Sequence, residues 1–341
     1  MGSGTAAAWP RFSPESLLDA RLCDLGLRIR GTPLERRLEK LDAQLESAGV
    51  KFRPHTWLST DWFSPDGVPG FSIPFYLAHP KLARLERSQM LEVEGGTRDW
   101  CLKLMRHETA HALDNAYRLR RRRRWREVFG SPSRPYRATY VPRTSSRKFV
   151  MNLDNWYAQS HPVEDFAETF AVWLGQRSQW RKRYAGWPAL RKLEYVDELM
   201  QEIRARPPLV RSRECVDSLP RLRMTLRQFY RAKKAQYGEE DRSLYDHDLL
   251  RLFSNDPSSR RRTSAATFLR KERRYLRRQI AKWTGQYQFV VDQVLKGMII
   301  RCRDLRLHLA HGEQQTREGA VVLLTAHTTA YVRARHREYF R

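Results

Sequence analysis

Two histidines with a glutamate beside them could bind and use a metal ion. The stretch Trp100–Tyr117 reads WCLKLMRHETAHALDNAY, and an H-E-x-x-H motif lies at its centre. Residues four apart share one face of an α-helix, so His107 and His111 can direct two imidazoles at one ion. Glu108 lies about 100° further around the helix, where a carboxylate can accept a proton from water that the metal activates. The same short pattern also occurs by chance in helices that bind no metal.

The residues before the motif predict the helix that it requires. Gly95 and Gly96 interrupt the preceding pattern, and Thr97 is a favourable N-cap residue. Asp99 would lie in the first turn, where the helix dipole favours an acidic side chain. We therefore expect a helix that begins near Thr97 and carries the motif in its middle.

A third metal ligand must come from elsewhere in the chain, since a catalytic zinc ion takes three protein ligands and keeps one open position. Glu164 and Glu168 fit best, because they are four residues apart on one predicted helix. One could bind the metal while the other accepts the N–H of a ligand histidine. Asp114, one turn after His111, could be a further partner of this kind, and His161 could be a ligand or a helix cap. The candidates with suitable side chains are Asp114, His161, Glu164, Asp165 and Glu168.

The helix with the two glutamates is otherwise apolar. Phe166, Phe170 and Trp173 recur at helical spacing and predict a buried face. Two carboxylates turned toward that face would be costly without a partner, and a metal–histidine cluster is such a partner. Exposure of both carboxylates at the surface is the alternative.

An arginine run follows the predicted metal helix. Its members are Arg120, Arg121, Arg122, Arg123 and Arg124. Charge runs are commonly solvated faces of a protein. The alternative is a docking site for phosphates or carboxylates of a substrate or of another polyanion.

Composition bounds the class of protein and its partners. The 341 residues suffice for one large or two ordinary domains, and a hydrophobic fraction of 41% supports real cores. With 64 Lys and Arg against 38 Asp and Glu, the net charge is +26, which attracts nucleic acid, anionic membranes or acidic peptides. No apolar run is long enough to span a membrane, and the N-terminus lacks a signal-peptide pattern. The four cysteines are far apart in sequence, so we expect reduced thiols and a cytoplasmic protein.

The patterns predict an α+β fold in two domains, 1–206 and 207–341. In the first part we expect helices over about 33–48, 80–91 and 190–203, and strands over 52–58, 71–77 and 149–153. Pro74 within the second strand favours an edge, where an extended peptide could add to the sheet.

The second part has few strand signals. Its candidate helices cover Leu222–Tyr237, Thr263–Thr284, Gln286–Leu309 and Glu318–Phe340. It holds 29 basic and 14 acidic residues, and the first part is also basic, with 35 and 24. We therefore expect a basic, mainly helical C-terminal domain.

A family resemblance joins these motifs. H-E-x-x-H followed by a second helix with two acids resembles the gluzincin group of zinc peptidases, and Glu164-Asp165-Phe166-Ala167-Glu168 is similar to the E-x-x-A-E helix of anthrax lethal factor. Longer stretches, among them RHETAHALDNAYR, WYAQSHPVEDFAETFAVWL and YAGWPALRKLEYVDELM, resemble a bacterial family of zinc-binding metallopeptidases over about residues 9–206. One departure is the spacing of 53 residues between His111 and Glu164, which implies an insertion.

The resemblance implies a zincin-like catalytic domain with one Zn²⁺ per chain. His107, His111 and Glu164 would be its ligands, Glu108 its general base, and Glu168 the support of a histidine. It also implies that Tyr157, seven residues before Glu164, stabilises the transition state. The alternative for Tyr157 is an aromatic side chain packed beside Trp156.

Two functions from different classes remain after this reasoning. The first is a zinc metallopeptidase that acts on an acidic peptide or on a protein associated with a polyanion. The second is a nucleic-acid-binding protein with a structural or vestigial zinc site. Structural zinc sites are usually rich in cysteine and closed, and these four cysteines do not cluster. A third reading, an interaction scaffold with a degenerate site, gives no physical reason for Glu108.

Overall fold

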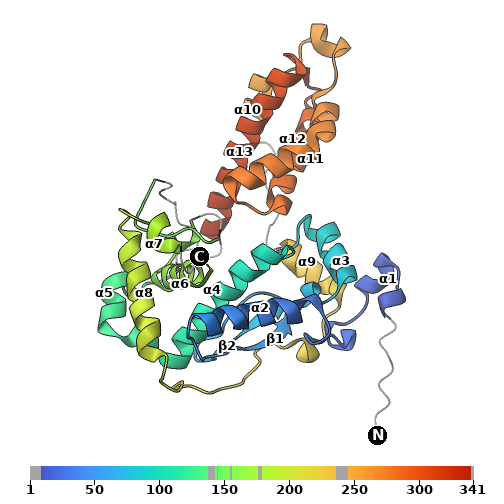
Figure 1. The fold of residues 1–341 in the computed structure, drawn as a ribbon. Coiled ribbons are helices and arrows are strands. Elements are labelled where there is room, and N and C mark those ends of the chain that lie inside the picture. The colour runs from blue at the N-terminus through green and yellow to red at the C-terminus, as the bar shows by residue number, and fades with distance from the viewer. Residues whose placement is uncertain are drawn as a thin grey trace. The chain divides into compact units, whose positions relative to one another are not determined.

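The computed structural model describes residues 9–136, 143, 145–153, 156–175, 179–235 and 245–338, the last six of these by their backbone alone. The described chain is mostly helical with two small two-stranded sheets, in agreement with the expected α+β class. It forms two compact units (Figure 1). The first comprises Met1–Gln89 and Val93–Ala232, and the second comprises Met90–Glu92 and Lys233–Arg341.

Residues 207–232 pack within the first unit, although composition alone separates them from it. The amide of Leu22 donates to the carbonyl of Met224 at 3.0 Å, and Arg21 forms an antiparallel bridge with Thr225. Backbone hydrogen bonds of this kind leave no trace in composition. The sequence pattern changes at 206/207, whereas the boundary between the two compact units lies later in the chain, between Ala232 and Lys233.

Helices are the main regular elements of the described residues between 9 and 235. The predicted helices are present, and prolines and capping side chains begin several of them, as at Thr32, whose hydroxyl accepts from the amide of Leu34 at 3.2 Å. The helices are α1 (Pro14–Leu18), α2 (Pro33–Ser47), α3 (Pro80–Met90), α4 (Arg98–Tyr117), α5 (Arg123–Phe129), α6 (Pro162–Gly175), α7 (Trp180–Arg183), α8 (Ala189–Ile203) and α9 (Leu226–Ala235).

A short parallel sheet joins β1 (His55–Ser59) to β2 (Gly70–Pro74). All five residues of β2 are buried. On the side away from β1, the amide of Ser72 donates to the carbonyl of Phe63 at 2.9 Å. In a two-stranded sheet β2 is an edge strand, as Pro74 predicts, and the bridge to Phe63 covers this edge at Ser72.

The expected strand over 149–153 is wrong, because side chains satisfy the amides that a strand would use. The amide of Met151 donates to the hydroxyl of Tyr184 at 3.1 Å. The amide of Leu153 donates to the carboxylate of Glu168 at 2.8 Å. The segment is irregular and is bound to the interior of the first unit through these contacts.

Helix α6 is the centre of the first unit's core. Every residue from Pro162 to Leu174 is buried, so the helix is surrounded by protein. Phe166 packs against Trp125 and Phe129 of α5, with ring centroids 5.9 and 5.5 Å apart. Each fully buried aromatic side chain contributes roughly 1.5–3 kcal/mol. This packing fixes α6 beside α4, the helix that carries the H-E-x-x-H motif.

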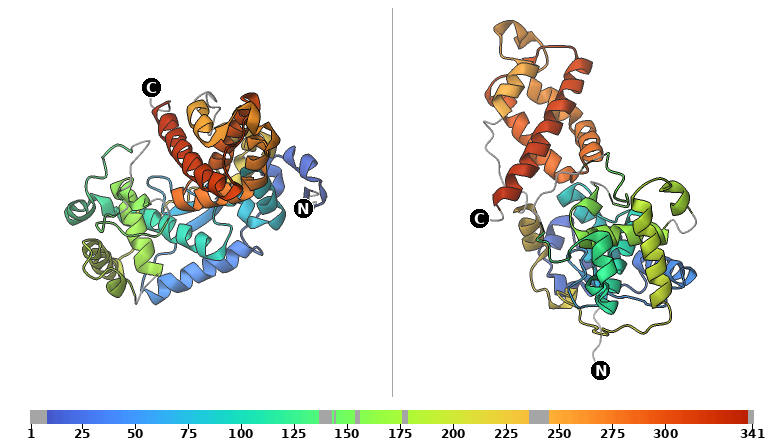
Figure 2. Two further views of the ribbon diagram at one scale, coloured as in Figure 1. Left: turned by 90° about the horizontal axis from the view of Figure 1, so that it is seen from above. Right: turned by 90° about the vertical axis from the view of Figure 1, so that its left-hand side faces the viewer.

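The second unit is a helical bundle with its own core. Figure 2 shows its long helices side by side in both views. They are α11 (Ala265–Thr284), α12 (Gln288–Asp304) and α13 (Glu313–Glu338), accompanied by α10 (Asp246–Leu252). A small antiparallel sheet pairs β3 (Phe253–Ser254) with β4 (His308–Leu309), where the sequence predicts the end of a helix. In the part of the chain that the structure describes, we find no helix with the length and apolarity to cross a bilayer.

Candidate metal centre

Helix α4 presents the motif as the sequence predicts. Thr97 caps it, and the Thr97 hydroxyl accepts from the amide of Trp100 at 3.3 Å. The helix ends at Arg118, which has a left-handed φ of 54°. His107 and Glu108 lie in the buried middle of the helix.

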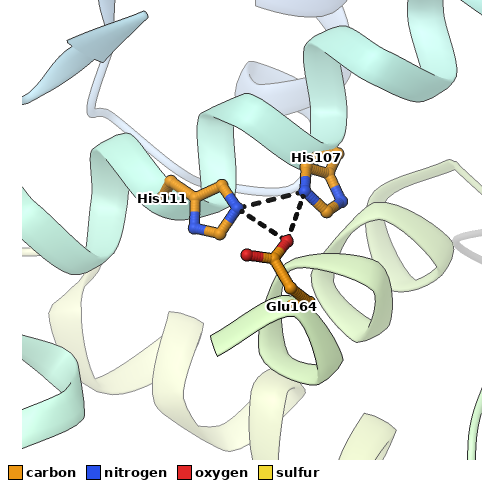
Figure 3. Close-up of side chains that lie close together, drawn as sticks. All are labelled: His107, His111 and Glu164. Carbon is orange, nitrogen blue, oxygen red and sulfur yellow. Dashed lines mark hydrogen bonds and ion pairs between the residues drawn. The ribbon is translucent and has the colours of Figure 1, made fainter. Parts of the chain in front are cut away.

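Three side-chain atoms of α4 and α6 converge on one point. The Nε2 atoms of His107 and His111 are 3.0 Å apart, and Oε2 of Glu164 lies 3.1 and 3.3 Å from them. Figure 3 shows these side chains pointing toward one another. This arrangement could hold a metal ion.

The dimensions of the cluster suit zinc. A tetrahedral zinc ion with bonds of about 2.0–2.1 Å separates its ligand atoms by roughly 3.3–3.4 Å. The observed separations of 3.0, 3.1 and 3.3 Å are only slightly shorter. Two imidazoles and one carboxylate are also a donor set that catalytic zinc uses, with a fourth position left open.

A bound cation would also balance the buried negative charges of the cluster. Three carboxylates, those of Glu108, Glu164 and Glu168, are buried beside two histidines. Burial alone would lower the pKa of His107, but Glu164 and Glu168 outweigh it and raise that pKa well above its usual value. Burial likewise opposes the negative charge of Glu164, yet His111 and His107 hold the pKa of Glu164 well below its usual range. A bound divalent cation would balance the same carboxylates.

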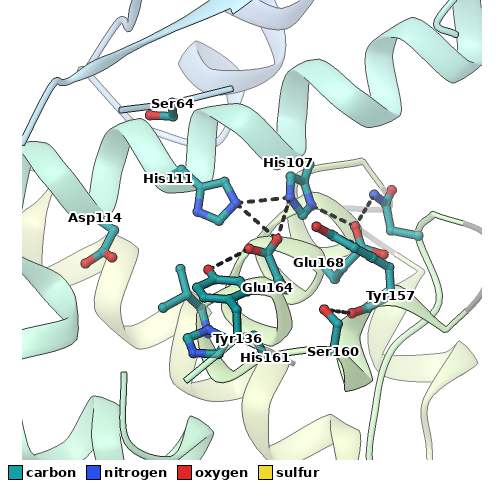
Figure 4. A network of polar contacts seen from close by, with 12 residues as sticks. Ser64, His107, His111, Asp114, Tyr136, Tyr157, Ser160, His161, Glu164 and Glu168 are labelled. Carbon is teal, nitrogen blue, oxygen red and sulfur yellow. Dashed lines mark hydrogen bonds and ion pairs between the residues drawn. The ribbon is translucent and has the colours of Figure 1, made fainter. Parts of the chain in front are cut away.

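Glu168 orients His107 from the side opposite the converging atoms. The Glu168 Oε1 atom lies 2.9 Å from His107 Nδ1 and accepts from the side-chain Nδ2 of Asn152 at 2.9 Å. Its Oε2 accepts from the amide of Leu153 at 2.8 Å. These contacts, shown in part in Figure 4, direct Nε2 of His107 toward Glu164 and His111.

Glu108 keeps one buried oxygen free. Among the described residues, no hydrogen-bond partner reaches its Oε2 atom. Burial raises the pKa of Glu108 above its ordinary value, although His107 and His111 act in the opposite direction. An unpaired buried carboxylate oxygen normally costs free energy, so its presence beside a metal-binding cluster indicates a chemical use.

Tyr136 belongs to the cluster, although no motif or spacing in the sequence indicates it. Its hydroxyl donates to Glu164 Oε1 at 2.8 Å. Its ring stacks on His161 with centroids 3.7 Å apart, and the side chain remains 55% exposed. It lies in an irregular segment, where no periodic pattern could indicate its direction.

His161 acts at the start of α6 and not as a ligand in this structure. Its Nε2 donates to the carbonyl of Arg134 at 2.7 Å, and its Nδ1 accepts from the amide of Val163 at 3.2 Å. Both ring nitrogens are therefore engaged. Of the two roles left open by the sequence, the structure supports the helix cap.

Asp114 is turned away from the histidines. It accepts from the amide of Arg120 at 2.7 Å and also from the Arg120 guanidinium. Figure 4 shows it further along α4, with no dashed line to His111. The expected contact between Asp114 and a ligand histidine is therefore replaced by an ion pair that holds the chain after α4.

The arginine run is largely neutralised by carboxylates of the first unit. Arg122 pairs with Glu202 at 2.7 Å and Arg124 with Glu198 at 2.5 Å, both on α8. Arg123 pairs with Glu127 at 3.1 Å, and Arg120 with Asp114. Only Arg121 has no ion pair within the described residues. These ion pairs hold α5 and the residues just before it against α8. The run therefore leaves little unpaired charge for a polyanion.

Tyr157 lies beside the cluster, as the family resemblance implies. Its ring is tilted by 49° against that of His107, with centroids 5.6 Å apart. Burial, reinforced by Glu164 and Glu108, raises the pKa of Tyr157 well above its usual value. The hydroxyl therefore stays protonated at neutral pH and keeps a hydrogen to donate.

Asp165 makes a second buried ion pair next to the cluster. Its Oδ2 lies 2.5 Å from Nζ of Lys192 on α8, which also sits 4.1 Å from the centroid of the Phe149 ring. Burial raises the pKa of Asp165 to about 7 despite the lysine. With this partner, Asp165 fixes α6 to α8 and is not one of the converging groups.

Comparison with known proteins agrees with this geometry. Residues 86–187 match the model of a family described as "Putative zinc-binding metallo-peptidase". The matched segment includes all the residues of the cluster, and the expected resemblance to zinc-binding metallopeptidases is confirmed over a shorter range than 9–206. Searches of curated proteins and of solved structures gave no match.

Proposed function

We propose that this protein is a zinc-dependent peptidase of the gluzincin kind with a zincin-like catalytic centre. The observation that carries the proposal is the convergence of His107, His111 and Glu164 beside the unpaired carboxylate oxygen of Glu108. A structural zinc site would take four protein ligands. The described part of the chain brings three donors together, which supports a site with one position for water or substrate.

The chain's residues divide the work of hydrolysis. Zinc bound here would supply Lewis acidity and a water molecule with a lowered pKa. The free oxygen of Glu108 accepts a proton from the attacking water and returns it to the leaving amine. Burial favours the protonated form of Glu108 after the first transfer, which suits the second.

Two tyrosines can stabilise the oxyanion that develops on the scissile carbonyl. Tyr157 stays protonated beside His107 and can donate a hydrogen bond. Tyr136 donates a hydrogen bond to Glu164 in this structure, so it would have to break that bond before it could donate to the substrate. Tyr157 is therefore our first candidate for this role.

The substrate we propose is an acidic peptide or a protein associated with a polyanion. A net charge of +26 raises the local concentration of such partners. Four of the five arginines of 120–124 are paired with carboxylates, so recognition would depend on other basic residues. Reduced thiols favour the cytoplasm as the place of action.

Reversible removal of zinc tests the proposed function. The full chain with added zinc is expected to cleave members of a quenched fluorescent peptide library enriched in Asp and Glu. A chelator should abolish cleavage, and equimolar zinc should restore it. Cleavage that persists in the chelator after confirmed loss of metal would contradict the proposal, as would a fully zinc-loaded chain that cleaves no peptide in the library.

Glu168→Gln is expected to weaken zinc binding without removing a ligand. Glu168 accepts three hydrogen bonds through its two oxygens, and glutamine would place an NH₂ donor where one of these acceptors lies. The orientation of His107 would therefore be lost. Outer partners of this kind typically contribute 10–100-fold to metal affinity, and we expect a loss of about that size. Competition with a chromophoric zinc chelator measures it, and Glu194→Gln on the exposed face of α8 is the matched control. Equal affinities of both variants would exclude this role of Glu168.

A further inference from the structure

A second concave site lies in the first unit, at the end of α4 away from the histidines. It is a cavity of about 460 Å³, within the range of small-ligand pockets. Tyr117 contributes to its wall and follows His111 by six residues, or about 9 Å along the helix axis. The cavity is therefore distinct from the proposed catalytic centre.

The wall of this cavity carries positive charge only. Its basic residues come from three chain segments and are Lys51, Arg53, Arg204, Arg206, Arg211 and Arg213. No aspartate or glutamate is among the described residues that line it. A sequence with 38 acidic residues could readily have placed one there, as it does opposite Arg122 and Arg124.

Four of these cations have no carboxylate partner in the described chain. They are Lys51, Arg204, Arg211 and Arg213. The other two are partly neutralised, since Arg53 lies 3.4 Å from Asp42 and Arg206 lies 3.0 Å from Glu202. Like charges gathered around one concavity repel one another, and an anion in the cavity would remove that repulsion.

The segment with Arg211 and Arg213 is held in place and does not depend on a ligand for its position. The amides of Leu209 and Val210 both donate to the carbonyl of Ala116, at 2.9 and 3.0 Å. Further along, Nε2 of His55 lies 2.9 Å from the carbonyl oxygen of Glu214. In Figure 1 this stretch runs from α8 past β2 and β1 toward α9.

Arg204 also has a defined place. It follows the last residue of α8, and its guanidinium lies over Gly49, so close that a Cβ there would be 3.0 Å from Nε. Gly49 has a positive φ of 73°. A glycine at this position thus permits both the turn after α2 and the approach of the arginine.

We propose that this cavity binds an anion with two or more phosphate groups. Guanidinium groups bind phosphate through paired N–H donors, and they do so from a planar, always charged group. Four unpaired cations exceed what one carboxylate would balance, whereas a short polyphosphate balances them. The phosphates could belong to a small free polyphosphate or to the backbone of a nucleic acid, and the chemistry of recognition is the same.

Calorimetric titration of the full zinc-loaded chain with inorganic tripolyphosphate tests the proposal. We expect saturable binding of one anion per chain that weakens as salt is raised. In Arg211→Gln/Arg213→Gln, the dissociation constant should rise about tenfold or more, because two charge-assisted contacts are lost. Arg36→Gln/Arg87→Gln removes the same charge from exposed positions on α2 and α3 and should bind like the wild type.

Equal weakening in both double variants would overturn the proposal, because binding would then follow net charge and not the cavity. Absence of saturable binding by the wild type would overturn it as well. Thermal unfolding establishes that the variants are folded, and Lys51→Gln with Arg213→Gln serves if the first pair is not. Displacement of a bound single-stranded oligonucleotide by tripolyphosphate would assign the phosphates to nucleic acid, and failure to bind the oligonucleotide would assign them to a small polyphosphate.

Discussion

Glu108→Gln is expected to abolish most peptide hydrolysis while the chain keeps its zinc. The substitution preserves the size of the side chain but removes the group that accepts the proton. General acid–base catalysis typically contributes 10²–10⁴-fold, so we expect kcat to fall by about that factor or more. The metal ligands His107, His111 and Glu164 are unchanged, and Glu108 makes no hydrogen bond through Oε2 that the variant would break.

Steady-state kinetics on the best library peptide, together with elemental analysis, measures both quantities on one sample. Glu194→Gln carries the same chemical change on the exposed face of α8 and should match the wild type in both. Full zinc content and a wild-type kcat in Glu108→Gln would show that Glu108 is not the general base. Loss of zinc in this variant would instead show that Glu108 contributes to binding the metal.

Glu164→Ala is expected to lose zinc altogether under mild chelation. Only two imidazoles of the cluster would remain, and the loss of affinity should exceed the roughly 10–100-fold expected for an outer partner such as Glu168. His161 cannot replace the carboxylate without breaking its bonds to Arg134 and Val163. Asp114 would have to leave Arg120.

Zinc per chain after chelator exposure is the first measurement, with Glu194→Ala as the control. The zinc-dependent rise in the unfolding temperature is the second, because a ligand of the folded state stabilises it in proportion to the logarithm of its concentration over Kd. We expect both to vanish in Glu164→Ala. Undiminished zinc in the variant would show that another residue is the third ligand, which would contradict the assignment of Glu164.

Local patterns sufficed to predict the helices that build the cluster. The spacing of His107 and His111 and that of Glu164 and Glu168 follow from helical periodicity, which acts over one turn. The contact between the histidines and the glutamates follows from the free-energy penalty of burial, since carboxylates on a buried helix require a partner. These arguments use few residues and do not depend on the path of the chain between the two helices.

The rest of the site depends on that path and could not be predicted. Tyr136 reaches Glu164 from an irregular segment whose direction is set by tertiary contacts. Arg122 and Arg124 pair with residues on α8, 80 and 74 positions later in sequence, so no local pattern could show that their charge is balanced. The segment 149–153 has the composition of a strand, yet its amides bind the side chains of Tyr184 and Glu168.

The three ligand atoms also discriminate between metal ions by their chemistry. Helices α4 and α6 are packed so that two imidazole nitrogens and one carboxylate oxygen lie 3.0–3.3 Å apart. Calcium prefers six to eight oxygen ligands, whereas two of these three donor atoms are nitrogens. Magnesium would meet the same nitrogens and would have to give up its water shell. The packing of Phe166 against α5 holds α6, and with it Glu164, in this position. The hydrophobic core thus holds in place a donor set whose two nitrogens favour zinc over the abundant cellular cations calcium and magnesium.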